Sequence, residues 1–367
     1  MMAVICPNCK KRNELNLSQW RCPDCENAWE PEPSKNLANE KILVDERHLW
    51  RYKSWMGNPV EKPVTLGAGG TSLSKVRFQG REVLFKNEFI NPSGSFKDRG
   101  VEVMINVLHA MGAQRVIEDS SGNAGASLAA YAARLGIHAE IYIPENASPQ
   151  KLAQIAMYGA EIKLIPGPRE NATRQLQAAV LNGEVYASHA WHPAYLLGQQ
   201  TAAWEVWEQL GHRAPDVWVT PVGQGGHFLG IWLGFLSLYE SGLIKHIPRM
   251  VAVQAANMAP IDKMFNENLQ TLPKMDLSHK TQADGVVVAN PVRWQRILQV
   301  LHESDGFTVA VEEEDIQPAR NELARLGFFV EPTSAVTTAA LPSIIRQTGQ
   351  RDVIVVSLTG SGLKVPI

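Results

Sequence analysis

The feature that most constrains the fold is a regular alternation of short apolar runs and helical segments, which begins near residue 83. The apolar runs are typical of buried strands, and several of the helical segments end at a glycine, the residue that best adopts the left-handed conformation that stops a helix. Such alternation predicts parallel sheets whose faces are both covered by helices. We therefore expect an α/β protein that binds its ligands beyond the carboxyl ends of the strands.

The predicted strands and helices cover most of the chain after residue 83. The strands are Val83–Phe85, Arg115–Glu118, Glu140–Ile143, Ile162–Ile165, Asp216–Val222, Met250–Gln254 and Asp352–Leu358. The helices are Val101–Met111, Ala124–Leu135, Gln150–Tyr158 and Arg169–Leu181, and the last three are followed by Gly136, Gly159 and Gly183.

Composition excludes or disfavours three classes of protein. A chain of 367 residues that is 45% hydrophobic and 20% charged buries a large core, so wholesale disorder is excluded. Its net charge of −2 disfavours binding to a nucleic acid backbone. The longest apolar stretch, Phe228–Tyr239, is shorter than the roughly 20 residues of a membrane span. Because the N-terminus also lacks the pattern of a secretory signal, we expect a cytoplasmic protein.

The four cysteines lie in the first 25 residues, with the spacing C-x2-C-x12-C-x2-C. Cys6, Cys9, Cys22 and Cys25 would form a closed four-thiolate site, which is typical of a structural zinc ion. Because about 30 residues cannot build a core of their own, the metal would supply the folding energy. The alternatives are redox pairs, free thiols or a ribbon that binds nucleic acid. We predict a zinc ribbon over residues 1–30, a linker over 31–36 and a catalytic body over 37–367.

Four segments carry chemistry. Lys97 stands where a loop becomes a helix, a position that disfavours an ammonium group; the alternative is an exposed lysine beside a surface Asp98–Arg99 pair. The segment 120–125 (SSGNAG) suits an anionic group, or is an ordinary capped helix start. The glycine loop 223–227 (GQGGH) suits a phosphate, or is a tight turn. The segment 357–364 (SLTGSGLK) offers neutral hydroxyls, or is a C-terminal turn.

Together, NPSGSFKDRG, SSGNAGASLAAYAARLGI, the glycine loop and LTGSGLK resemble the threonine synthase branch of the fold-type II pyridoxal-phosphate enzymes, in order over roughly residues 60–367. The resemblance implies two doubly wound lobes of the tryptophan synthase β-like type, the smaller over roughly residues 95–195. It also implies a homodimer and a small amino-acid substrate. Some members of the branch carry an N-terminal zinc ribbon.

The resemblance assigns roles position by position. Lys97 would bond to the cofactor and move the substrate's Cα proton, and Asn123 would hydrogen-bond the cofactor's ring oxygen. Thr359 would face the pyridine nitrogen; a neutral hydroxyl there suits elimination and replacement better than transamination. The phosphate would be held by Gly223, Gln224, Gly225, Gly226 and His227, and the substrate by Ser120, Ser121, Gly122, His192 and Tyr195.

The chain departs from the branch at one substrate position. Threonine synthases usually read N-P-x-R-L-E-G-Q where this chain reads HPAYLLGQ, so Tyr195 replaces the arginine taken to bind the substrate's phosphate. Losing such a charge-assisted contact costs about 2–5 kcal/mol when it is buried, which makes O-phosphohomoserine a doubtful substrate. Protonated His189 or His192 would compensate in part, and Tyr195 is alternatively a packing residue.

Three hypotheses follow. The first is a lyase that makes threonine from O-phosphohomoserine. The second keeps the cofactor but eliminates or replaces a group at Cβ of another amino acid, as in an ammonia-lyase, a dehydratase or a cysteine or cysteate synthase. The third is a non-catalytic protein that binds the cofactor; an intact Lys97 argues against it. The sequence does not identify the substrate's side chain, an effector or a partner of the ribbon.

Overall fold

The computed structural model describes residues 2–34, 36–145, 149–167 and 169–364. The chain divides into two compact units whose segments alternate along the sequence. Unit 1 contains Met1–Ser34, Asn39–Gly70 and Asn91–Gln199, and unit 2 contains Lys35–Ala38, Thr71–Ile90 and Gln200–Ile367.

The N-terminal part of unit 1 is a small antiparallel sheet of three strands in the order β2-β1-β3. Its strands are β1 (Ala3–Ile5), β2 (Arg12–Glu14) and β3 (Glu30–Pro31). Pro31, where the predicted linker begins, pairs with Val4 of β1, so the ribbon's sheet includes this residue.

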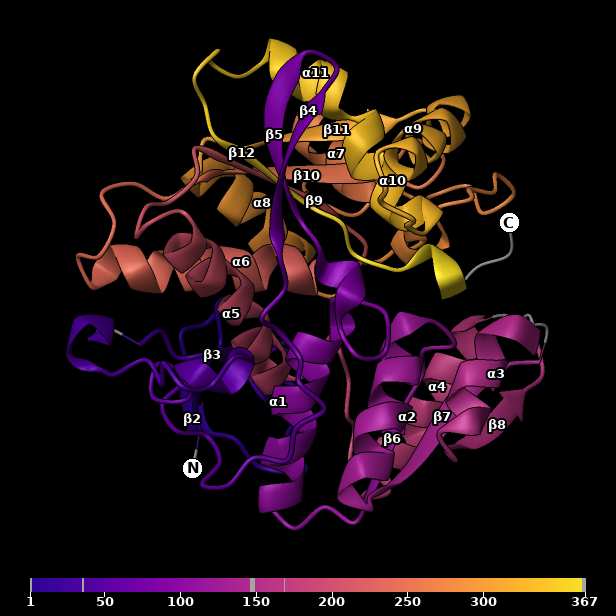
Figure 1. Cartoon of the computed structure of the whole chain (residues 1–367). Helices are drawn as coiled ribbons and strands as arrows, with labels where there is room; N and C mark the ends of the chain where they lie inside the picture. Colours follow the sequence, from indigo (N-terminus) through magenta and orange to yellow (C-terminus); the bar gives the residue numbers. More distant parts are fainter. Residues whose placement is uncertain (1, 35, 146–148, 168, 365–367) are drawn as a thin grey trace. The chain divides into compact units, whose positions relative to one another are not determined.

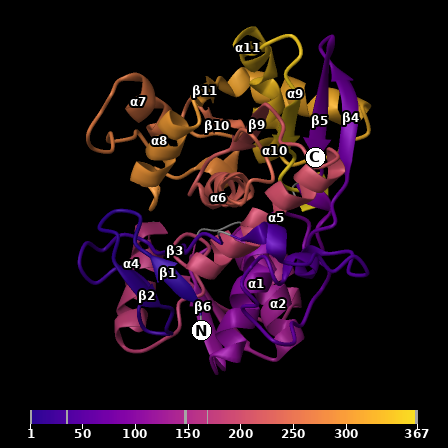
Figure 2. The same cartoon turned by 90° about the vertical axis from the view of Figure 1, so that its left-hand side faces the viewer.

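The larger part of unit 1 is a three-stranded parallel sheet in the order β6-β7-β8. In chain order its elements are α1 (Lys97–Ala110), β6 (Arg115–Glu118), α2 (Asn123–Leu135), β7 (His138–Pro144), α3 (Pro149–Met157), β8 (Glu161–Ile165) and α4 (Arg169–Leu181). Figure 2 shows α4 on one side of β6, and α1 and α2 on the other. Helix α2 ends at Gly136, whose φ of 69° is left-handed as predicted.

Unit 2 is built on a six-stranded sheet in the order β11-β10-β9-β12-β5-β4. Its strands are β4 (Leu73–Phe78), β5 (Arg81–Lys86), β9 (Val217–Pro221), β10 (Arg249–Ala255), β11 (Phe307–Val311) and β12 (Ile354–Ser357). All neighbouring strands are parallel except the edge strand β4, which forms an antiparallel hairpin with β5. The predicted strands of this sheet are therefore parallel as expected, and the antiparallel edge strand β4 adds to them.

Helices cover both faces of the six-stranded sheet, with α6 and α8 on one side and α9 and α10 on the other (Figure 1). The core between α9, α10 and the strands is rich in valine, which suits strands buried on both faces. The helices are α5 (Pro193–Gln209), which crosses the boundary of the units, α6 (Gly226–Glu240), α7 (Pro260–Asn266), α8 (Trp294–Glu303), α9 (Glu313–Arg325), α10 (Pro332–Ala339) and α11 (Leu341–Arg346). Short 3-10 helices are Leu37–Asn39, Leu49–Tyr52, Glu88–Ile90, Asp284–Val286 and Gly362–Lys364.

The predicted α/β class is confirmed, and each predicted strand and helix overlaps an observed one. The sequence patterns do not predict strands β4 and β11. Among the residues that the structure describes, no helix is both long and apolar enough to cross a membrane.

Candidate active site

Lys97 is the first residue of α1, as predicted, and is partly buried. Its neighbours Asp98 and Arg99 are both fully buried. The carboxylate of Asp98 accepts hydrogen bonds from the backbone N–H of Ser93 and the hydroxyl of Ser127, both at 2.6 Å. The alternative of a surface Asp98–Arg99 pair is therefore wrong, and the lysine stands at the start of a helix whose first turn is interior.

Tyr195 lies beside Lys97. The Nζ atom of Lys97 is 5.8 Å from the centroid of the Tyr195 ring and 4.8 Å from that of Phe96. Tyr195 is only 1% exposed, and a Cβ atom added to Gly100 would lie 2.4 Å from its ring. Burial raises the pKa of its hydroxyl well above 10, so it stays neutral. Tyr195 thus packs against α1 at Gly100 and borders Lys97.

Glu118, at the end of β6, forms a buried pair with His189. Its carboxylate accepts a hydrogen bond from the backbone N–H of His189 and contacts Nδ1 of the same residue, both at 3.1 Å. Burial raises the pKa of Glu118 to about 7, although the charge of Lys97 acts in the opposite direction. The imidazole also packs edge-on against Tyr195, with ring centroids 6.2 Å apart. Lys97, Glu118, His189 and Tyr195 therefore form one cluster in unit 1.

The segment 120–123 continues directly from this cluster into α2. Gly122 occupies the N-cap of α2, and no side chain caps the helix there. The alternative of a helix capped by serine or asparagine is therefore wrong for this helix. The N–H of Gly122 is 3.4 Å from the Ser120 hydroxyl, and a Cβ atom at Gly125 would lie 1.9 Å from the Ser120 carbonyl. Ser121 and Asn123 are partly buried beside Gly122.

His192 stands immediately before α5 and is 6% exposed. Its Nδ1 atom accepts a hydrogen bond from the backbone N–H of Ala194 at 3.3 Å. In this structure the side chain therefore supports the first turn of α5, the helix that carries Tyr195.

In unit 2, the glycine loop joins β9 to α6, as predicted. Gly225 is the N-cap of α6 with a left-handed φ of 80°, and a Cβ atom there would lie 2.3 Å from Ile297. A Cβ atom at Gly223 would approach the carbonyl oxygen of Gly285 to 2.9 Å. Gln224 accepts a hydrogen bond from the backbone of Val292 at 3.0 Å. Glycine is thus required in this loop, which ends at the N-terminus of Gly226–Glu240, where backbone N–H groups favour an anion.

Thr359 follows β12 and is fully buried. The hydroxyl of Ser334, on α10, accepts the backbone N–H groups of Thr359 and Gly360 at 2.7 and 2.9 Å and lies 3.0 Å from the Thr359 hydroxyl. On the strand itself, Ser357 contacts Nε2 of His227 in the glycine loop at 3.1 Å. Sequence reasoning missed Ser334, because a lone serine in a helical stretch gives no signal of this long-range contact.

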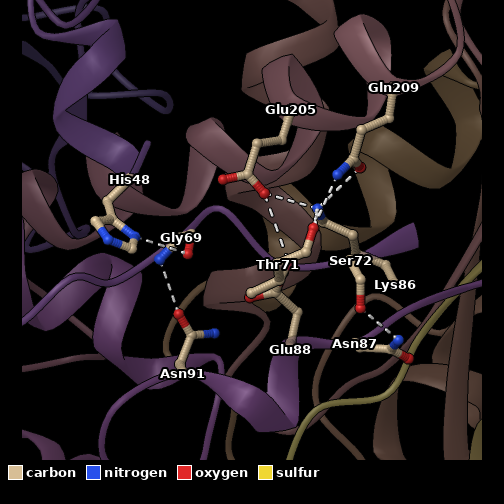
Figure 3. A network of polar contacts seen from close by, with 10 residues as sticks. All are labelled: His48, Gly69, Thr71, Ser72, Lys86, Asn87, Glu88, Asn91, Glu205 and Gln209. Carbon is tan, nitrogen blue, oxygen red and sulfur yellow. Dashed lines mark hydrogen bonds and ion pairs between the residues drawn. The ribbon is translucent and has the colours of Figure 1, made fainter. Parts of the chain in front are cut away.

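A buried polar network in unit 2 surrounds the end of β5 (Figure 3). The Nζ atom of Lys86, which is fully buried, donates to Glu205 at 2.6 Å, to the Thr71 carbonyl at 2.8 Å and to Gln209 at 3.0 Å. The Lys86 carbonyl accepts the N–H of Leu358 at 2.9 Å. The network therefore supports the strand end that precedes Thr359.

Figure 3 also shows a second set of contacts, which belongs to unit 1. Asn91 accepts a hydrogen bond from the backbone N–H of Gly69 at 2.9 Å. The same glycine has its carbonyl 3.5 Å from Nδ1 of His48. Asn91 opens the segment that leads to Lys97, so these contacts fix the start of that segment.

The four cysteine sulfurs come together as predicted, all within 4.8 Å of one another. Cys6 is 3.4 Å from Cys25, and Cys9 is 3.5 Å from Cys22. The two C-x2-C turns are built alike. The N–H of Lys10 donates to the Cys6 carbonyl at 3.0 Å, and the N–H of Glu26 donates to the Cys22 carbonyl at 2.9 Å. This set of four thiols fits a tetrahedral ion.

Comparisons with known proteins agree with this arrangement. Residues 64–360 match the family model described as "Pyridoxal-phosphate dependent enzyme". The chain belongs to this family. This enzyme is also 32% identical to the threonine synthase of Methanocaldococcus jannaschii, over 100% of this chain and 93% of that protein. It is 35% identical to the threonine synthase of Mycobacterium tuberculosis, over 83% of this chain and 84% of that protein.

Solved structures share the fold. The T.th. threonine deaminase is 25% identical, with a TM-score of 0.67 over 79% of this chain and 92% of that one. Maize serine racemase is 24% identical, with a TM-score of 0.66 over 80% of this chain and 89% of that one. The resemblance to fold-type II enzymes is thereby confirmed for the fold, and the threonine synthase branch by the curated relatives.

Proposed function

We propose that this enzyme is a lyase of the threonine synthase type, which converts O-phosphohomoserine and water to threonine and phosphate. The observation that carries the proposal is similarity to threonine synthases over the whole chain, with Lys97 at the start of a buried helix. Overall, the Cγ–O bond to phosphate and one Cβ–H bond break, while a Cβ–O bond to the oxygen of water and a Cγ–H bond form.

The residues present fit pyridoxal phosphate. We assign its phosphate to the glycine loop 223–227, where two glycines leave no room for side chains. Lys97 would be its covalent partner, Asn123 would contact its ring oxygen, and Thr359 its ring nitrogen. When bound, the cofactor draws electrons from the substrate's Cα. The hydroxyl of Ser334 orients that of Thr359. The ring nitrogen would therefore face a neutral hydroxyl instead of a carboxylate.

Lys97 is assigned the transfer of the substrate's protons at its Nζ atom. A helix N-terminus disfavours the ammonium form, while the nearby carboxylate of Glu118 favours it. Nζ thus lies close to a carboxylate that can hold an ammonium group in place.

The phosphate of the substrate requires a cation that Tyr195 does not provide. We assign this role to His189, whose Nδ1 atom lies 3.1 Å from the Glu118 carboxylate and whose ring packs against Tyr195. Ser120, Ser121, Gly122 and His192 are proposed to complete the substrate site.

The test is an assay of the purified holoenzyme with O-phosphohomoserine, in which threonine and phosphate are measured separately. The proposal predicts both products in equal amounts, and none from Lys97→Ala. A holoenzyme that shows the cofactor's visible absorbance yet releases no phosphate would refute the proposal.

A second candidate is β-elimination or β-replacement on a smaller amino acid. The observation that favours it is Tyr195, which is neutral and interior at the position where the resemblance expects arginine. This candidate predicts turnover of a β-substituted amino acid, such as O-acetylserine, with a higher kcat/KM than that of O-phosphohomoserine. The reverse order would exclude it.

We also propose that Cys6, Cys9, Cys22 and Cys25 bind a structural zinc ion. With four protein ligands, such an ion keeps no open position, so its contribution is to folding. Metal analysis of the reduced protein should give one zinc per chain. Protein that is folded in the ribbon and free of zinc would refute the assignment.

A further inference from the structure

The ribbon contacts the rest of unit 1 through Trp20, two residues before Cys22. Its ring packs edge-on against Trp191, with centroids 4.6 Å apart and planes at 82°, and against Tyr186, with centroids 5.8 Å apart and planes at 66°. The guanidinium of Arg21 lies 4.7 Å from the same ring. Trp20 and Trp191 belong to the edge of the core that α4 forms with the parallel sheet.

The segment that Trp20 contacts lies beside β6 like a short extra strand. Tyr186 forms a parallel bridge with Ile117. The N–H of Ile117 donates to the Val185 carbonyl at 2.9 Å, and the N–H of Ala187 donates to the Ile117 carbonyl at 3.0 Å. These bonds fix the segment against the strand that ends in Glu118.

The same segment carries the polar groups of the candidate active site. The Tyr186 hydroxyl donates to Asp119 at 3.0 Å, and the backbone N–H of His189 donates to Glu118 at 3.1 Å. Four residues after His189, α5 begins at Pro193, and this helix places Tyr195 beside Lys97. A shift of the segment would therefore move the imidazole, and it would move the first turn of α5.

We propose that the ribbon acts as a positioning element for the active site, and that Trp20 transmits its effect by holding residues 185–192 against β6. When the ribbon is folded, Cys22 holds the chain in place, and this positions Trp20, two residues earlier, against Trp191 and Tyr186. The proposal goes beyond the identity of the substrate, since it applies to any amino acid that the site binds. It gives the N-terminal metal ribbon a role in catalysis that requires no contact between the metal and the substrate.

Hydrogen exchange of the full-length holoenzyme tests the proposal without reference to a substrate. Trp20→Ala should speed exchange of the Ala187 and His189 amides by about tenfold, the factor expected from the loss of both aromatic contacts. Trp20→Phe, which keeps an aromatic ring, should restore most of the protection. Arg21→Ala is the matched control, because it leaves both aromatic pairs in place. Amides of β9 and β10 in unit 2 serve as the internal reference.

A metal arm separates this role from simple destabilisation. Removal of the metal from the native protein should speed exchange of the same two amides, whereas removal from Trp20→Ala should add less than about a further twofold, since the connection is already lost. With any amino acid that the enzyme turns over, Trp20→Ala should raise KM more than it lowers kcat, and Trp20→Phe should reverse the change.

Unchanged exchange of both amides in Trp20→Ala with full metal content would overturn the proposal. So would equal effects of metal removal on the native protein and on Trp20→Ala. If Trp20→Ala does not fold, the same exchange measurements are made on Trp20→Phe. Its Ala187 and His189 amides should then exchange more slowly than those of the metal-free native protein. If O-phosphohomoserine is not a substrate but the exchange results hold, the proposed function fails and the positioning role stands.

Discussion

The buried network around Lys86 allows one prediction to be worked out in detail. Lys86→Met removes a cation that is fully buried and leaves the carboxylate of Glu205, 5% exposed, without it. The Thr71 carbonyl keeps a second donor, Nε2 of Gln209 at 2.8 Å, so the main loss is at Glu205. Breaking one side of a buried ion pair costs about 3–5 kcal/mol, and we expect the free energy of unfolding to fall by this amount.

The measurement is urea unfolding of the holoenzyme, followed by tryptophan fluorescence and circular dichroism. Lys75→Met is the control, because the Lys75–Glu82 pair at 2.9 Å lies on the adjacent hairpin strands with side chains 65% and 62% exposed; it should cost less than about 1 kcal/mol. The double variant Lys86→Met/Glu205→Gln should recover at least about 2 kcal/mol relative to Lys86→Met, since no uncompensated charge remains. Equal costs for Lys86→Met and Lys75→Met, or no recovery in the double variant, would refute the reasoning.

Further predictions concern the site and the ribbon. Lys97→Ala should abolish the visible absorbance of the bound cofactor; a spectrum like that of the native protein would show that another residue bonds to it. Gly100→Ala places a methyl group 2.4 Å from the Tyr195 ring and should lower stability by about 1–3 kcal/mol in urea unfolding. Because burial raises the pKa of Glu118 from 4.5 to about 7, its contribution to stability is present below pH 4.5 and is lost as pH rises through about 7. The urea midpoint of unfolding should therefore fall as pH rises from 4.5 to about 7, and it should fall less in Glu118→Gln than in the native protein. Parallel curves of midpoint against pH for the two proteins would contradict this. Cys22→Ala should lower bound zinc to well under one ion per chain, and undiminished zinc would exclude this ligand.

Much of the fold was predictable because its signals are local. Helices α2 and α3 and the strands around them follow from apolar runs and from glycines that adopt a left-handed φ, such as Gly136 and Gly159. Strand β4 was not predictable, because it pairs through a tight turn of Gln79 and Gly80, whose φ values are 47° and 81°. Glutamine is not one of the residues that usually mark such a turn.

The candidate site was predictable where one segment carries the signal. Lys97 at a helix start and glycines in a loop after a strand are visible as patterns of neighbouring residues. Glu118 was not assigned a role, because its partner His189 lies 71 residues later and only the sheet brings them together. Ser334 and Thr359 are likewise joined by tertiary structure. The assigned roles of the site residues, the domain boundaries, the oligomeric state and the cellular location stay predictions.

Helices α1 and α5 pack closely at two glycines. Gly100 admits the ring of Tyr195, and a Cβ atom at Gly198 would lie 2.1 Å from the carbonyl oxygen of Arg99. Sliding of one helix along the other would press Gly198 against the main chain of Arg99 and Gly100 against the Tyr195 ring. The amine of Lys97 and the phenol of Tyr195 should therefore keep a constant spacing during thermal motion, and in the proposed substrate site they would form a wall of fixed shape that does not adapt to each ligand.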